Sequence, residues 1–69
     1  MFRYKVSRRT EDGARQLEDI ANVPSPYAAA IQIAKGLGLD NGEVIDLKED
    51  GPRVAFQIGG RVYVFEMDP

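Results

Sequence analysis

The second half of the chain alternates polar and apolar residues in three short stretches. They cover residues 43–48, 53–58 and 61–67, and the last is rich in the β-branched and aromatic residues that favour strands. Turn-forming residues separate them, at Glu49-Asp50-Gly51-Pro52 and at Gly59-Gly60. Alternation with a period of two between such turns predicts three antiparallel strands joined by two hairpins.

The two turns also predict the register of these strands. A two-residue turn at Gly59-Gly60 pairs residue 58 with 61, 56 with 63 and 54 with 65. A loop centred on 50–51 pairs residue 48 with 53, 47 with 54 and 45 with 56. Both hairpins place the same apolar residues on one face, and a slip of one residue in either would scatter them over both faces. That face comprises Ile45, Leu47, Val54, Phe56, Ile58, Tyr63, Phe65 and Met67.

Residues 25–37 predict a helix that covers this face. Ser25 is a favourable N-cap, and Pro26 occupies the first helical position, where its missing N–H costs nothing. Gly36 or Gly38 ends the helix. The expected buried stripe follows helical spacing, and its alanines allow a close approach to the sheet. The stripe comprises Tyr27, Ala30, Ile31, Ala34 and Leu37.

The first third of the chain has two interpretations beyond an alternating strand over residues 2–8. In one, residues 11–14 form a hairpin turn and residues 15–22 return as a second strand. In the other, residues 11–21 are helical, which their local propensity favours. Gly13 argues against the helix, which would also leave the first strand without a sequential partner. We therefore predict a single α+β domain over residues 1–69 with the order ββαβββ, an antiparallel sheet with one helix on one face; the alternative is βααβββ.

Composition limits the chemistry that the chain can carry. It has no cysteine and no histidine, which excludes disulfides and the commonest metal ligand and general base. Its 69 residues make a small core, which a partner subunit often supplements. Without cysteine or histidine ligands we expect no metal, and we expect no cofactor. We also expect a cytoplasmic protein, because cysteine is absent and no stretch is apolar enough for a membrane span or a signal-peptide core.

Candidate catalytic groups all have structural explanations. Ser25 is accounted for as a cap, and no histidine is present to activate a hydroxyl. Two of the three acidic pairs, Glu11-Asp12 and Glu49-Asp50, fall in predicted turns, where aspartate is favoured. The glycines at 36, 38, 59 and 60 precede no helix that could hold a phosphate at its N-terminus. We therefore expect a protein that is not an enzyme.

Charge is distributed unevenly along the chain. Residues 1–15 sum to +3 and the remainder to −5, which gives a net charge of −2. One hypothesis is therefore a weak nucleic-acid-binding protein that uses the basic first strand. Against it, the overall balance is acidic and the aromatic residues of the three C-terminal strands are needed for the core. The candidate nucleic-acid contacts are Arg3, Lys5, Arg8 and Arg9.

The face of the sheet opposite the helix suggests a different role. The last strand is apolar on both sides, which is typical of a strand buried on both sides, yet one helix covers only one of them. An uncovered apolar patch on a small protein indicates a contact with a protein partner. We expect a non-catalytic protein-interaction module that acts as a homodimer or as a small subunit of an assembly. The candidate interface residues are Val44, Ala55, Val62 and Val64.

Overall fold

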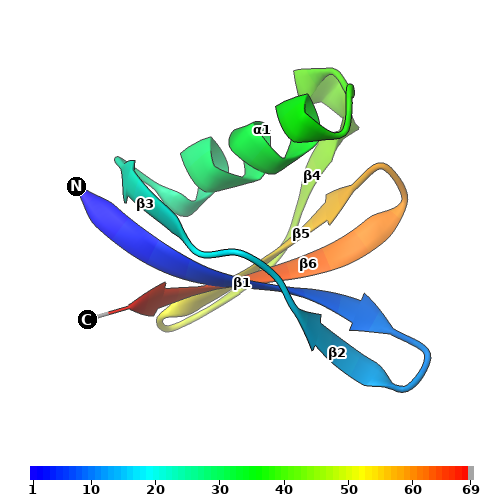
Figure 1. Cartoon of the computed structure of the whole chain (residues 1–69), viewed down its shortest axis with the longest axis horizontal. Helices are drawn as coiled ribbons and strands as arrows, with labels where there is room; N and C mark the ends of the chain where they lie inside the picture. Colours follow the sequence, from blue (N-terminus) through cyan, green and yellow to red (C-terminus); the bar gives the residue numbers. More distant parts are fainter. Residues whose placement is uncertain (69) are drawn as a thin grey trace.

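A computed structural model describes residues 1–68. It contains an antiparallel sheet of six strands with one helix packed against it (Figure 1). The order is βββαβββ, which is the predicted ββαβββ with its second strand divided in two. The elements in chain order are β1 (Phe2–Thr10), β2 (Gly13–Gln16), β3 (Ile20–Val23), α1 (Pro26–Gly36), the short 3₁₀ helix η1 (Asn41–Glu43), β4 (Val44–Asp50), β5 (Arg53–Ile58) and β6 (Arg61–Asp68).

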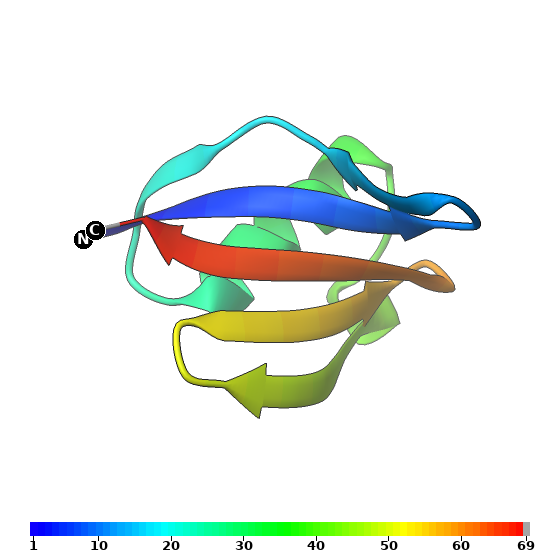
Figure 2. The same cartoon turned by 90° about the horizontal axis from the view of Figure 1, so that it is seen from below.

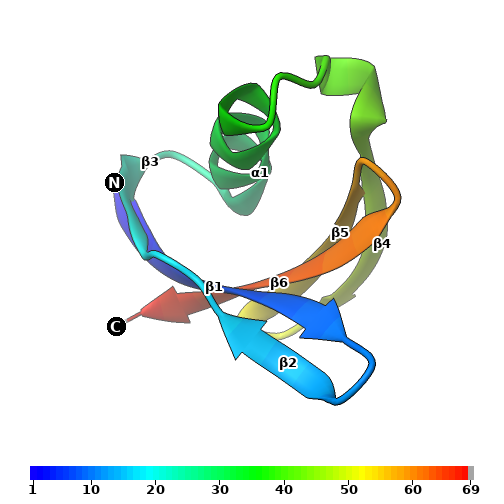
Figure 3. The same ribbon diagram turned by 45° about the vertical axis from the view of Figure 1, so that its right-hand side comes forward.

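The first and last strands lie next to each other in the middle of the sheet. The strand order is β2-β1-β6-β5-β4, and β3 also pairs with β1. The two chain ends therefore lie close together at one end of the sheet (Figure 2). The sheet curves around α1, so that the helix lies in its concave side (Figures 1 and 3).

The N-terminal segment is a hairpin, as we predicted in preference to a second helix. The hairpin turns at residues 11–12, and Gly13 follows with a φ of +133°, which a residue with a side chain rarely adopts. The returning chain is divided into β2 and β3, whereas one continuous strand was expected. Tyr4 lies opposite Ile20, and residues 17–19 interrupt the strand between β2 and β3.

The helix begins and ends where its sequence signals place it. The Ser25 hydroxyl oxygen accepts a hydrogen bond from the backbone N–H of Ala28 at 3.2 Å, and Pro26 is the first helical residue. Gly36 is the last, and Gly38 takes up the left-handed conformation, with a φ of +75°. Both ends are thus defined by capping residues that sequence rules recognise.

The buried stripe of α1 is rotated relative to the expected one. Ala29, Ala30 and Ala34 are fully buried, while Tyr27 and Leu37 are about half exposed. The small alanine side chains let the helix lie close to the sheet, and larger residues at the margins remain partly in solvent.

The β5–β6 hairpin has the predicted register, and the β4–β5 hairpin does not. The latter turns at Gly51-Pro52, so Asp50 pairs with Arg53 and Glu49 with Val54. A β-bulge between Asp46 and Lys48 then shifts the pairing by one residue. Relative to the register that the turn alone would set, the shift moves every β4 residue before the bulge to the other face of the sheet.

The bulge corrects the predicted core membership of β4. Ile45 pairs with Gln57 on the side away from the helix and is 47% exposed, and Leu47 lies within the bulge and is 46% exposed. Val44 instead pairs with the buried Ile58 and packs against the core.

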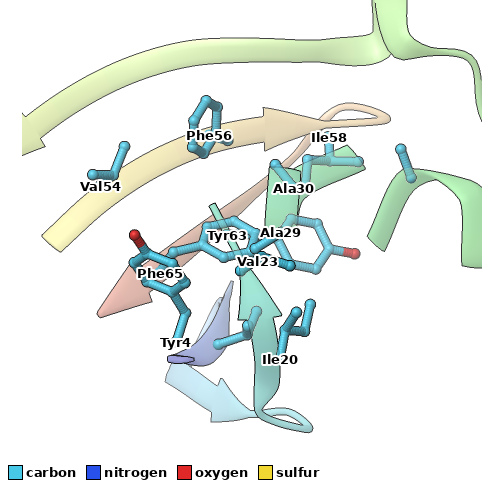
Figure 4. Close-up of a cluster of buried hydrophobic side chains, with 12 residues drawn as sticks. Tyr4, Ile20, Val23, Ala29, Ala30, Val54, Phe56, Ile58, Tyr63 and Phe65 are labelled. Carbon is cyan, nitrogen blue, oxygen red and sulfur yellow. The ribbon is translucent and has the colours of Figure 1, made fainter. Parts of the chain in front are cut away.

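The core lies between α1 and the concave side of the sheet (Figure 4). Phe56 and Phe65 pack edge to face, with ring centroids 5.7 Å apart. No polar or charged residue among residues 1–68 is buried. The twelve core residues are Tyr4, Val6, Ile20, Val23, Ala29, Ala30, Ala34, Val54, Phe56, Ile58, Tyr63 and Phe65.

Candidate interaction surface on the outer face of the sheet

The side of the sheet opposite α1, which we call the outer face, is bare. Figure 2 views the molecule from this side, with the strands in front and the helix behind them. The N-terminal strand could have covered this face, but it joins the sheet beside β6 instead. The register places these residues on the outer face: Arg3, Lys5, Ser7, Arg9, Ala14, Gln16, Ile45, Lys48, Asp50, Arg53, Ala55, Gln57, Val62, Val64, Glu66 and Asp68.

Small and apolar residues occupy the centre of the outer face. Val64 of β6 lies directly between Ser7 of β1 and Ala55 of β5. Val62 lies on the same face of β6, two residues before Val64. These four residues are half-buried, because longer side chains surround them. The result is a shallow depression of about 440 Å³ next to Val64. It is lined by Lys5, Val6, Ser7, Arg9, Ala14, Gln16, Arg53, Val64 and Glu66.

A row of alternating charge crosses the strands beside this centre. Lys5 pairs with Glu66, Glu66 with Arg53, and Arg53 with Asp50, so the signs run plus, minus, plus, minus across β1, β6, β5 and β4. Arg53 Nε and Glu66 Oε2 form an ion pair of 3.2 Å with both side chains exposed. The row is neutral as a whole and alternates strand by strand.

Three of the four residues expected at an interface share this surface. Ala55, Val62 and Val64 are neighbours on β5 and β6, whereas Val44 faces the core because of the bulge in β4. The same bulge brings Ile45 onto the outer face, where sequence analysis had not placed it. A bulge leaves no clear mark in the alternation of β4, so the pattern alone could not identify this residue.

The predicted nucleic-acid contacts do not form one surface. Arg3, Lys5 and Arg9 lie on the outer face, while Arg8 lies opposite Tyr63 on the helix side. Arg3 is also engaged in ion pairs, at 3.4 Å with Asp19 and 3.7 Å with Asp68.

The outer face also lacks the aromatic side chains that single-stranded nucleic acids stack upon. The aromatic residues of the strands all point to the helix side, and most of them are buried. They are Phe2, Tyr4, Phe56, Tyr63 and Phe65.

Within residues 1–68, no group of three or more acidic side chains could hold a metal ion. In the same range no helix has the length and apolar character needed to cross a membrane.

Comparisons with known proteins give no further guidance. No protein-family model, curated protein or solved structure matches this chain. A function therefore has to be inferred from the residues of the outer face themselves.

Proposed function

We propose that the protein is a non-catalytic interaction module whose outer face binds a second copy of the same chain. The observation that carries the proposal is the apolar centre formed by Ala55, Val62 and Val64, which no element among residues 1–68 covers. A strand that is apolar on both sides is normally buried on both sides. Packing a second sheet on this one would bury the outward side of β6, as in a β-sandwich.

The row of alternating charge favours a second copy over an unrelated partner. A two-fold axis parallel to the strands, between β6 and β5, places β6 of each copy over β5 of the other and β1 over β4. Glu66 then faces the partner's Arg53, and Lys5 faces the partner's Asp50. Val64 faces the partner's Ala55 in the adjacent row. The surface is thus self-complementary, which the two-fold symmetry of a homodimer requires.

The size of the outer face predicts a weak dimer. Figure 1 is viewed down the shortest axis of the molecule, so the face seen in Figure 2 spans principal extents of 28 and 20 Å. Complete coverage would bury an area near the lower end of the range for specific interfaces, which is roughly 1,200–2,000 Å² over both partners. We therefore expect dissociation in the micromolar range. The absence of cysteine is consistent with a role in the reducing cytoplasm.

Sedimentation equilibrium over a wide concentration range tests the proposal. The unmodified protein should shift from monomer to dimer, and Val64→Lys should remain a monomer because it places a charge in the apolar centre. Leu37→Lys is the matched control, since it makes the same kind of change at the half-exposed residue that caps the C-terminus of α1, away from the outer face. It should dimerise like the unmodified protein.

A strict monomer at the highest concentration, or equal dimerisation of Val64→Lys, would contradict the proposal. Larger assemblies that survive Val64→Lys would place the contact elsewhere on the molecule. Circular dichroism of both variants shows whether each is folded, so that a loss of dimer is not confused with a loss of structure.

A further inference from the structure

The strands β1 and β6 separate at the end of the sheet away from the chain termini. Their pairing ends at Arg8 and Tyr63, although β1 continues to Thr10 and β6 begins at Arg61. Figures 1 and 3 show the β1–β2 and β5–β6 hairpins diverging beyond this point. The space between them is a depression of about 680 Å³, which we call the wedge. The wedge is lined by Arg8, Arg9, Thr10, Glu11, Gly60, Arg61 and Val62.

Three arginines at this end share the helix side of the sheet. Arg8 lies opposite the buried Tyr63, Arg15 lies opposite Arg8, and Arg61 lies opposite the buried Ile58. Arg8 is therefore central, with Arg15 directly across on one neighbouring strand and Arg61 diagonal on the other. Two like charges directly opposite each other destabilise a sheet, so this arrangement opposes folding.

No carboxylate within residues 1–68 relieves this repulsion. The ion pairs in that range join Arg3 and Arg53 to acidic partners and leave the arginines around the wedge unpaired. Glu11 lines the wedge, but it is exposed in the β1–β2 turn and forms no ion pair with another residue of the 1–68 range. Arg8 is half-buried, which lowers the screening of its charge by water.

From this cluster we infer that the wedge binds a phosphate group carried by a compact ligand. A guanidinium donates two parallel hydrogen bonds to phosphate oxygens, and several arginines around one depression can engage one group together. The Thr10 hydroxyl lines the same depression and adds a further donor. Arg15 does not line the wedge, but a phosphate bound to Arg8 would offset part of the repulsion between Arg8 and Arg15.

The rest of the molecule favours a compact anion over a long nucleic-acid strand. The net charge of the chain is −2 despite the cluster, so the molecule as a whole does not attract an extended polyanion. No aromatic side chain lines the wedge, which leaves bases nothing to stack on. Repulsion of a compact ligand is weaker, because charges more than about 10 Å away are largely screened at moderate salt.

The arginines on which the phosphate site depends lie apart from the centre of the proposed dimer interface. The three arginines lie on the helix side of the sheet, whereas the dimer uses the outer face. Arg9 and Val62 line the wedge from the outer face, so a dimer built as proposed would cover that side of it. Arg8 and Arg61 lie on the helix side and would stay accessible in dimer and monomer alike. Loss of one function by mutation therefore leaves the other measurable.

Titration calorimetry with pyrophosphate, at about 50 mM salt to limit screening, tests the inference. We expect saturable binding that Arg8→Gln and Arg61→Gln each weaken by about tenfold or more, because each removes a charge-assisted hydrogen bond. Arg61 follows a turn and is exposed, so its variant should fold even if Arg8→Gln is impaired. Lys35→Gln is the control, since it removes one positive charge from an exposed position on α1 that lines neither the wedge nor the outer face, and it should bind as the unmodified protein does.

Two results would overturn the inference. One is the absence of saturable pyrophosphate binding, or an equal loss in Lys35→Gln, which would indicate attraction by net charge without a site. The other is much tighter binding of a single-stranded oligonucleotide with a steep dependence on salt, which would assign the arginines to a nucleic-acid backbone.

Discussion

Truncation of Phe65 tests how β6 divides its residues between the two faces of the sheet. Phe65 is fully buried and packs edge to face on Phe56, with an angle of 81° between the rings. Replacing a buried phenylalanine with alanine costs about 3–5 kcal/mol in lost transfer free energy and residual cavity. A domain of 69 residues has a free energy of unfolding of roughly 3–10 kcal/mol. Phe65→Ala should therefore remove a large part of the stability, or all of it.

Urea denaturation followed by circular dichroism measures this loss. Phe65→Leu keeps much of the volume and should cost about 1–2 kcal/mol, so it gives a readable transition even if the alanine variant is unfolded. Val64→Ala is the matched control on the other side of the same strand. At concentrations where the protein is monomeric, it should cost less than about 1 kcal/mol, because Val64 is only half-buried.

Comparing the two positions shows whether β6 presents only one of its sides to the core. Equal destabilisation by Val64→Ala and Phe65→Ala in the monomer would mean that β6 does not present one side to the core. A double-mutant cycle of leucine substitutions at Phe56 and Phe65 should show a coupling of about 0.5–1.5 kcal/mol, as expected for an edge-to-face aromatic pair.

Three further predictions concern single residues. Ser25→Ala should cost about 1 kcal/mol in urea denaturation by removing the N-cap of α1, and Ser25→Gly should cost less. Gly59→Ala should lower the midpoint of urea denaturation more than Gly60→Ala does. Both residues have positive φ, but of the two only Gly59 has a neighbour that an added Cβ would meet, Leu39 Cδ1 at 2.6 Å. Burial raises the pKa of Tyr4 above its ordinary value of 10.0, so its contribution to stability is complete below pH 10 and is lost as pH rises through the folded-state pKa. Urea midpoints measured from pH 8 upward should fall above pH 10, and Tyr4→Phe should remove that part of the fall.

Local signals in the sequence were sufficient to predict most of the fold. Gly59-Gly60 fixes a two-residue turn, and that turn determines the β5–β6 register for the whole length of both strands. Ser25 and Pro26 mark the start of α1 in the same local way. Gly13 outweighed the helical propensity of its neighbours, because its positive φ suits a hairpin and not a helix.

The β4 register could not be predicted, because its bulge depends on packing far along the chain. The register expected from the turn would have buried Ile45 and Leu47, but the bulge buries Val44 instead, against Ile58. The same limitation applies to the candidate sites. Arg15 and Arg61 join Arg8 only once β1, β2 and β6 are aligned, and residues 8 and 61 are too far apart in sequence for a local pattern to connect them.

A charge exchange between β5 and β6 tests the proposed dimer most directly. In the two-fold arrangement Glu66 faces the partner's Arg53, so Arg53→Glu alone or Glu66→Arg alone places like charges opposite each other across the interface. The double variant restores opposite charges there, and it keeps the pair within each chain. We predict that sedimentation equilibrium will show dimerisation in the unmodified protein and in the double variant, and its loss in both single variants. Equal dimerisation in all four proteins, or in none, would contradict the account.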